Sequence, residues 1–306
     1  MAFSNPSTPQ PAICDYEGSA YRTDFWTKDR VYEDAVERVA LKALLPPSGR
    51  RLIEIGAGFG RLADLYAGYD QVILFDYSRS ILREARAKWG DEGPLGKPHY
   101  TYVAGNFYTL PFVTGLFDTV TMVRVIHHAQ DAPQVLRGIG EIIAPGGTFV
   151  LEFANKRHLK AIARWWLGRQ DWNPFLQPPY EFAELNFDFH PHWMQSQLKQ
   201  AGFTIRARRS VSHFRVGFIK RLVPTRWLVE LDSLAQPTGR WWQLTPSVII
   251  RSLASRSKPA AAEGDFFRCP ICHSGALVEQ DNVLTCQSCQ RQWSKHDGLY
   301  DFKEPL

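Results

Sequence analysis

The chain has 306 residues, of which 44% are hydrophobic and 22% charged, and its formal net charge is +5. This composition is typical of a globular chain. The sequence contains no run of about 20 apolar residues, so it predicts no membrane-spanning helix. Residues 1–12 are polar and lack a basic region followed by an apolar core, so they do not resemble a signal peptide and we expect a cytoplasmic protein.

The first regular element expected along the chain is a helix. Residues 1–27 have no regular pattern but carry several aromatic side chains, and we expect this segment either to cover a bound ligand as a lid or simply to pack on the domain. In residues 28–45 small apolar side chains recur at every fourth position from Val31 to Ala43, and Pro46 ends the pattern. This periodicity predicts an amphipathic helix.

Short apolar strands then alternate with amphipathic helices up to residue 153. Strands that are apolar on both faces belong to parallel sheets covered by helices, and right-handed crossovers make such a sheet doubly wound. The sequence therefore predicts an α/β protein with a doubly wound, mainly parallel, Rossmann-like sheet. The expected strands are 51–55, 71–76, 100–104, 117–123 and 148–153, and the expected helices are 61–67, 79–89 and 133–143.

The second half of the chain is less regular. Residues 155–187 are expected to form an irregular aromatic insertion over the sheet, and 255–265 form a small, polar linker. Between them we expect a helix at 192–200, a strand at 203–209 with 211–216 as its hairpin partner, and helices at 227–234 and 248–255.

Residues 154–260 form a basic stretch that is rich in tryptophan. They contain 17 Lys and Arg against 6 Asp and Glu, a net charge of +11, so the rest of the chain carries −6. Seven of the ten tryptophans also lie there. Basic surface with interleaved aromatic side chains suits an anionic partner, either RNA or a membrane surface. The alternative is that these aromatics belong to the core beside a solvated basic face.

The sequence EIGAGFG, residues 54–60, joins the first expected strand to the next helix. Glycines there permit a tight turn and a close approach of the backbone to a ligand. Asp76 ends the second strand, where a carboxylate can accept hydrogen bonds from two ribose hydroxyls or cap the next helix. Asn106 and Phe107 follow the third strand, where they can read an adenine amino group and flank its ring.

A glycine loop of this kind also occurs in nicotinamide-dependent dehydrogenases, so a dehydrogenase is the main alternative interpretation of residues 54–60. The dinucleotide fingerprint is Gly-x-Gly-x-x-Gly. Counted from Gly56, its last glycine would fall at Arg61, where an arginine cannot allow the close packing of helix on strand that glycine gives. The loop therefore disfavours a dinucleotide.

Three further motifs follow the glycine loop along the chain: FD at 117–118, HH at 127–128 and PGG at 145–147. With the loop, they resemble the class I S-adenosylmethionine-dependent methyltransferases, especially the small-molecule enzymes of quinone biosynthesis, over residues 50–153. Glu54 stands where many members have Asp. The resemblance implies S-adenosylmethionine as cofactor, with its methionine part at Glu54 and the glycines, its ribose at Asp76 and its adenine at Asn106 and Phe107. The implied cofactor-binding residues are Glu54, Gly56, Ala57, Gly58, Gly60, Asp76, Tyr77, Asn106, Phe107 and Arg124.

His127 and His128 follow the fourth strand at the carboxyl edge, where doubly wound sheets bind their ligands. Either is a candidate general base if the acceptor must lose a proton, and the alternative is that both merely line the pocket or cap the next helix. The fourth strand lacks the Asn/Asp-Pro-Pro-Tyr motif of amino-methylating enzymes. Cys14 is the only cysteine outside the C-terminus, far from where a pyrimidine-methylating nucleophile would lie. We therefore expect a small-molecule or lipid-like acceptor.

Cys269, Cys272, Cys286 and Cys289 have the spacing C-x2-C-x13-C-x2-C. This spacing predicts a closed, structural zinc site with four thiolates, and without a secretion signal two disulfides are the weaker alternative. Residues 269–302 resemble the small zinc-ribbon protein that activates several tRNA, rRNA and release-factor methyltransferases, although Trp293-Ser294 replaces its usual Tyr-Pro. The resemblance implies a ribbon that supports the catalytic domain, and zinc ribbons also contact RNA.

The predicted organisation is an N-terminal segment (1–27), a methyltransferase domain (28–254), a linker (255–265) and a zinc ribbon (266–306). Two other functions stay open. The ribbon and the basic stretch favour an RNA or protein methyltransferase. A non-catalytic module that binds the cofactor or RNA is the other alternative, which the intact glycine loop and Asp76 disfavour.

Overall fold

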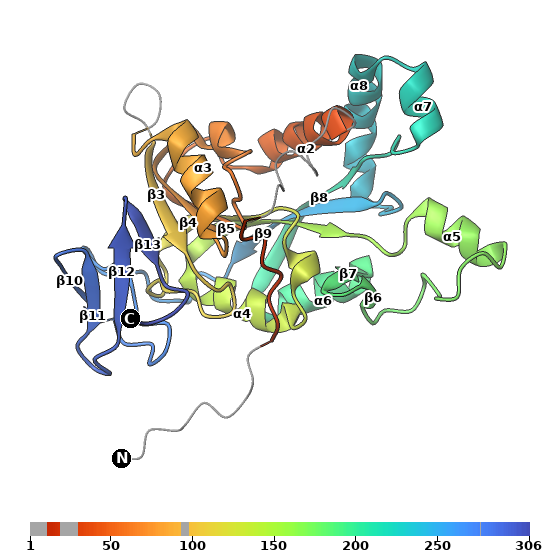
Figure 1. Ribbon diagram of the computed structural model, residues 1–306. Coiled ribbons are helices and arrows are strands. Elements are labelled where there is room, and N and C mark those ends of the chain that lie inside the picture. The colour runs from red at the N-terminus through yellow and green to blue at the C-terminus, as the bar shows by residue number, and fades with distance from the viewer. Residues whose placement is uncertain (1–10, 19–29, 93–97, 276) are drawn as a thin grey trace.

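The computed structural model describes residues 11–18, 30–92, 98–275 and 277–306, and one eleven-stranded sheet runs through them (Figure 1). In spatial order its strands are β10 (Leu277–Gln280), β11 (Val283–Cys286), β12 (Gln292–His296), β13 (Leu299–Asp301), β3 (His99–Ala104), β2 (Tyr69–Asp76), β1 (Gly49–Ile55), β4 (Phe117–Met122), β5 (Ile143–Ala154), β9 (Ser247–Ala254) and β8 (Phe203–Val211). Strands β13 to β5 in this order are parallel, and β9 runs antiparallel to both its neighbours. The predicted doubly wound, mainly parallel sheet is confirmed.

Helices cover both faces of this sheet, and two short strands form a separate hairpin. The α-helices are α2 (Val31–Leu44), α3 (Arg79–Trp89), α4 (Ala132–Ile142), α5 (Leu159–Trp166), α6 (Pro191–Gln200), α7 (Gly217–Leu222) and α8 (Thr225–Ala235). Single 3-10 turns are η2 (Ala63–Tyr66), η4 (Ile126–His128) and η5 (Gln236–Arg240), and the hairpin strands are β6 (Tyr180–Ala183) and β7 (Asn186–Asp188). No described helix is both long enough and apolar enough to cross a membrane.

The core has two layers because successive side chains of a strand point to opposite faces. Ile53 of β1 and Ile73 of β2 belong to one apolar cluster, together with α4 and α6. Their chain neighbours Leu52 and Val72 belong to the other, together with α2, α3 and α8. Burial of β1 and β2 on both faces explains why their sequences are almost continuously apolar.

The C-terminal ribbon extends the sheet. Strand β13 pairs in parallel with β3, from Leu299 opposite Tyr102 to Asp301 opposite Ala104. The ring of Phe267 stacks on Phe112 with centroids 5.7 Å apart. Without β13, β3 would be an open edge with unpaired backbone groups. The ribbon therefore completes the sheet and shares the apolar cluster that contains α4.

The helix expected at 248–255 is wrong, because this segment is the central antiparallel strand β9. Val248, Ile249 and Ile250 are β-branched and fully buried, and they pair with β5 on one side and β8 on the other. The prediction that residues 211–216 pair with β8 as a hairpin is also wrong, because β9 is the strand that pairs with β8 in the sheet.

Two other expectations were only partly right. The helix expected at 61–67 is reduced to the 3-10 turn η2, because the residues before it form the glycine turn. The insertion expected to be irregular at 155–187 contains helix α5 and most of the β6–β7 hairpin.

Candidate functional site

The glycine loop folds back on the end of β2. The backbone N–H groups of Gly56 and Ala57 both donate to the carbonyl of Phe75, at 2.7 and 3.0 Å. Gly56 has a φ of +73°, and a Cβ there would lie 2.1 Å from Cγ2 of Val125. This turn therefore requires glycine, both for its backbone conformation and for its close approach to the end of β4.

Asp76 holds the loop in place. Its Oδ2 accepts a hydrogen bond from the backbone of Gly58 at 2.8 Å, and its Oδ1 accepts one from Ser78 at 2.9 Å. The cap of α3 is Ser78, whose hydroxyl accepts from Ile81, so the capping alternative does not account for Asp76. Burial raises the pKa of the Asp76 carboxyl. A carboxylate oxygen can accept more than one hydrogen bond, and Asp76 lines a cavity.

This first hollow, the loop cavity, gathers many of the residues singled out from the sequence. Its lining includes the expected residues Gly56, Gly58, Asp76, Tyr77, Phe107, Arg124 and His128, together with Cys14, Tyr16, Phe75, Ile81 and Val125. Glu54, Ala57, Gly60 and Asn106 are not part of that lining. Gly60 instead packs on Trp89, whose indole N–H donates to its carbonyl. Asn106 fixes the turn after β3, because its Oδ1 accepts from the backbone of Tyr108 at 2.8 Å.

Glu54 lies behind the loop with only 3% of its surface exposed. Its Oε2 has no hydrogen-bond partner among the described residues. Burial raises the pKa of this carboxyl to about 8, although Arg61 opposes the shift. A buried acceptor without a partner is costly, and such groups often mark a place where a ligand binds.

A second, larger hollow adjoins the loop cavity and is called the polar cavity here. Its volume is about 410 Å³, and it is lined by Arg30, Arg124, His127, Glu152, Ala154, Asn155, His158, Phe182, Asn186, Asp188, Arg215, Pro246 and Ser247. Arg124 lines both hollows. It lies two residues after β4 and has a φ of +59°, an uncommon conformation for a residue with a side chain. Its backbone N–H donates to Glu152 and its Nε to Glu37.

The two neighbouring histidines have different surroundings. His128 lines the loop cavity, and its ring nitrogens lie 3.1 Å from the hydroxyl of Tyr16 and 3.0 Å from the carbonyl of Leu185. His127 lines the polar cavity, and its Nδ1 has no partner in the part of the chain that the structure describes. Burial, the nearby His128 and Arg124 lower the pKa of His127 well below its usual value. His127 is therefore neutral at physiological pH.

Asp188 is a candidate that the sequence did not reveal. It ends β7 and lines the polar cavity, where burial raises the pKa of its carboxyl to about 6 despite Lys156 and Arg215. Carboxyls with such pKa values often act in proton transfer. In the sequence only its position three residues before Pro191, the first residue of α6, distinguished Asp188, and that is too common to signal a site.

The described part of the N-terminal segment, residues 11–18, lies across the loop cavity. Cys14 and Tyr16 contribute to its lining. The carboxylate of Glu17 accepts hydrogen bonds from the backbone of Arg79 and Ser80, at 2.7 and 3.0 Å, at the start of α3. The other aromatic residues on which the lid expectation rested lie in 19–29, outside the described residues.

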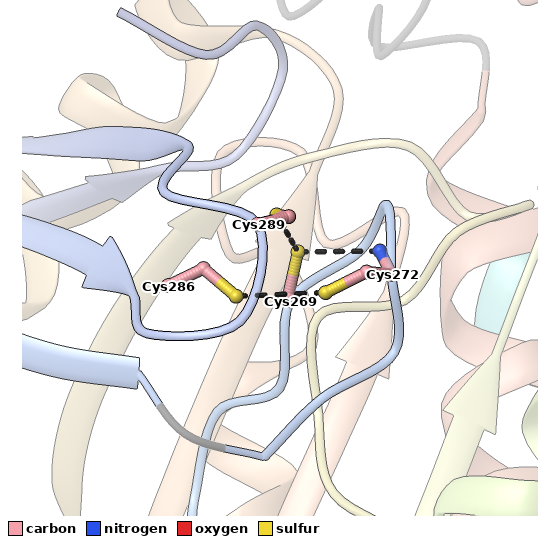
Figure 2. A group of neighbouring side chains, drawn as sticks. All are labelled: Cys269, Cys272, Cys286 and Cys289. Carbon is pink, nitrogen blue, oxygen red and sulfur yellow. Dashed lines mark hydrogen bonds between the residues drawn. The ribbon is translucent and has the colours of Figure 1, made fainter. Parts of the chain in front are cut away.

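The four ribbon cysteines converge from two loops (Figure 2). All four Sγ atoms lie within 4.8 Å of one another. Cys269 and Cys289 have their Sγ atoms 3.6 Å apart, and those of Cys272 and Cys286 are 3.5 Å apart. Tetrahedral zinc with bonds of about 2.3 Å separates its sulfurs by about 3.8 Å. The four thiols are unpaired by disulfides, and this arrangement is compatible with a zinc ribbon.

Comparison with known proteins agrees with this geometry. Residues 53–151 match the methyltransferase domain family. The chain is 33% identical over 111 residues to the ubiquinone/menaquinone biosynthesis C-methyltransferase UbiE of Vibrio cholerae. This alignment covers 35% of this chain and 42% of the relative. It is 30% identical over 115 residues to UbiE of Shewanella sp., and this alignment covers 36% of this chain and 45% of the relative. The match thus spans less than half the length of these relatives.

Two solved structures share the fold. One is a complex that contains the Haloferax volcanii Trm112 methyltransferase activator, with a TM-score of 0.52 and 18% identity over 77% of this chain and 96% of the other. The second is an S-adenosylmethionine-dependent methyltransferase from Mesorhizobium loti, with a TM-score of 0.52 and 21% identity over 72% and 99%.

The strand order and the two solved structures define a Rossmann-like α/β methyltransferase fold, and the match to the methyltransferase domain family covers residues 53–151 of this chain. At modest identity its curated relatives are the C-methyltransferases of quinone biosynthesis.

Proposed function

We propose that this protein transfers the methyl group of S-adenosylmethionine to a small-molecule or lipid-like acceptor held in the polar cavity. The observation that carries the proposal is the position of Arg124, which lines both the loop cavity and the polar cavity. A cofactor held at the glycine loop would therefore lie next to a second hollow large enough for a separate reactant. Family relatives that methylate carbon atoms support an acceptor of this class.

The residues of the loop cavity suit this cofactor. The two oxygens of Asp76 can accept hydrogen bonds from vicinal ribose hydroxyls, and the rings of Tyr77 and Phe107 line the same wall, where they can flank adenine. The buried Oε2 of Glu54 is the acceptor that the ammonium group of the methionine part would need, provided that this group reaches behind the loop. When bound, the sulfonium supplies an activated methyl group for in-line displacement, so the protein mainly positions the reactants and excludes water.

His127 is the better of the two histidines for a general base. Its Nδ1 is unsatisfied among the described residues and the ring lines the polar cavity, whereas both nitrogens of His128 have partners. The lowered pKa keeps His127 in the neutral form that a general base needs, although the same shift makes the imidazole a weaker base. His128 would instead join the N-terminal segment to the β6–β7 hairpin. We further infer that residues 1–27 act as a lid, and removal of that segment should weaken cofactor binding.

The four ribbon cysteines would bind one zinc ion with no open position, which gives the metal a structural role. The cluster lies in the segment that leads to β13, so a folded ribbon would keep the edge of β3 covered. The ribbon would thus act as a built-in support of the catalytic domain.

The direct test is transfer of radiolabelled methyl from S-adenosylmethionine into host extract that is separated into RNA, protein and lipid or small-molecule fractions. We expect label in the lipid or small-molecule fraction, and its loss in the Asp76→Ala variant. Absence of label in every fraction, with cofactor binding intact, would instead favour a non-catalytic binding module.

An RNA or protein methyltransferase is the second candidate. The observation that favours it is the ribbon itself, which extends the catalytic sheet through β13, together with the net positive charge of residues 154–260. Label in the RNA or protein fraction, lost in the same variant, would select this function. RNA binding should also weaken steeply with salt, because bound counterions are released.

A further inference from the structure

A third hollow leads outward from the polar cavity. This apolar groove has a volume of about 350 Å³ and lies between the start of α5, the residues that follow β8, and the segment after η5. It shares His158, Arg215 and Pro246 with the polar cavity. The rim of the groove includes Leu159, Val216 and Trp242, whose side chains are 62%, 47% and 70% exposed.

Exposed apolar side chains are concentrated around this groove. Among the described residues, 14 of the 18 large apolar side chains that are exposed lie between positions 159 and 242. They lie on α5, α7, α8 and β6, between α5 and β6, just before α7 and just after η5. Figure 1 shows α5 and α7 projecting from the molecule on the side opposite the ribbon. A monomeric globular protein rarely exposes so many large apolar groups without a partner for them. The main ones are Leu159, Trp166, Leu167, Val216, Phe218, Leu222, Trp227, Leu234, Trp241 and Trp242.

Cations are interleaved with these side chains. Lys160, Arg221, Arg226 and Arg240 are all exposed on the same elements. The guanidinium groups of Arg226 and Arg240 lie over the rings of Trp227 and Trp241, at 5.6 and 5.9 Å from their centroids. An apolar ring beside a cation suits the interface of a bilayer, where the ring enters the headgroup region and the charge meets an anionic lipid.

We propose that this surface, the Trp–Arg face, docks the protein on an anionic lipid bilayer. The face comprises the exposed apolar and basic side chains of residues 159–169 and 216–242. The exposed cations of this face favour an anionic occupant, and they disfavour a second copy of the chain, whose own cations would repel them across the contact. A bilayer fits better than RNA because Leu159, Val216 and Leu222 are aliphatic and cannot stack on bases, whereas they gain free energy on leaving water. Docking of this kind does not depend on the proposed methyl transfer.

The proposal is tested by co-sedimentation of the full chain with phosphatidylcholine vesicles that either contain or lack phosphatidylglycerol. We expect binding to the anionic vesicles only, and weaker binding as salt increases. In the variant Leu159→Ser/Trp241→Ser/Trp242→Ser, affinity should fall at least about tenfold, because three large apolar side chains no longer leave water on binding. Thermal unfolding and affinity for S-adenosylmethionine should be unchanged.

The matched control is Ile271→Ser/Val278→Ser, which removes two exposed apolar side chains from the ribbon and should bind vesicles normally. A second variant, Arg226→Gln/Arg240→Gln, keeps the apolar groups and should lose the preference for anionic vesicles. The proposal is overturned if the protein ignores anionic vesicles, if both apolar variants bind equally well, or if the face instead retains bulk tRNA. It is also overturned if ultracentrifugation shows a dimer that the triple variant abolishes.

Discussion

Lys303, in the tail of the ribbon, lies over the ring of Tyr77, with its Nζ 3.8 Å from the ring centroid. Tyr77 lines the loop cavity directly beside Asp76. The same ammonium group is 3.4 Å from Asp15, which belongs to the N-terminal segment that crosses that cavity. The ribbon, the wall of the loop cavity and the N-terminal segment therefore meet at one side chain, although 226 positions separate Tyr77 from Lys303 in the chain.

We expect Lys303→Met to raise the dissociation constant for S-adenosylmethionine about two- to thirtyfold, because a cation–π contact contributes about 0.5–2 kcal/mol. Lys303→Arg keeps the charge and should bind the cofactor almost normally. Calorimetric titration measures both values. Equal affinity in the wild type and the Met variant would show that this contact does not order the cavity wall.

Replacement of Asp76 by Asn should weaken cofactor binding about 10- to 100-fold, because hydrogen bonds to a charged group contribute about 1.5–3 kcal/mol. Asn also brings an amide donor that opposes the N–H of Gly58 or Ser78. The control is Asp70→Asn, an exposed position on the same strand. Fluorescence or calorimetric binding distinguishes them, and comparable losses in the two variants would refute the ribose role.

His127→Gln should lower kcat about 100-fold or more, as expected for loss of a general base, and should leave cofactor affinity unchanged. His192→Gln, on the exposed side of α6, is the control. Since the pKa of His127 is lowered well below its usual value, the wild-type rate should stay level as the pH falls through 6.5. An acid limb near pH 6 that disappears in Asp188→Asn would assign the base to Asp188 instead.

Cofactor binding should depend on pH through Glu54. Its pKa of about 8 means that the free protein carries this carboxyl protonated at neutral pH. If the ammonium group of the cofactor binds there, the proton must leave. Affinity should then rise with pH, by at most about tenfold per unit, up to about pH 8, where the ammonium group of the cofactor itself begins to lose its proton. Glu54→Gln should flatten this dependence, whereas the exposed Glu92→Gln should retain it. A wild-type affinity independent of pH would contradict the contact.

Purified protein should contain one zinc ion per chain, and Cys286→Ser should lose it. Removal of the metal should lower Tm by about 5 °C or more, because a loss of about 2 kcal/mol shifts a domain of this size by several degrees. The reason is that Trp293 and Phe302 of the ribbon share the core with α4. Cys14→Ser removes a thiol outside the cluster and should retain the zinc, as measured by metal analysis. A metal-free wild type with the same Tm would contradict a structural zinc.

The sequence by itself determined the parallel core of this protein. Strands β1 to β5 are buried on both faces and separated by glycines, prolines and caps, so their apolar runs and breaks carry the signal locally. The glycine turn at Gly56 and the spacing of the four cysteines are equally local, since each follows from residues close together in the chain.

Only the tertiary structure decided the antiparallel edge of the sheet and the lining of the polar cavity. The run at Val248 can form a helix or a strand, and it becomes a strand because β5 and β8 offer unpaired backbone on both sides. Glu54 and Gly60 belong to the same local motif as Gly56 and Gly58, yet only the latter two are part of the lining of the loop cavity, and the motif by itself does not predict this difference. Asp188 has its unusual pKa only because distant segments exclude water from it, and no local pattern encodes that burial.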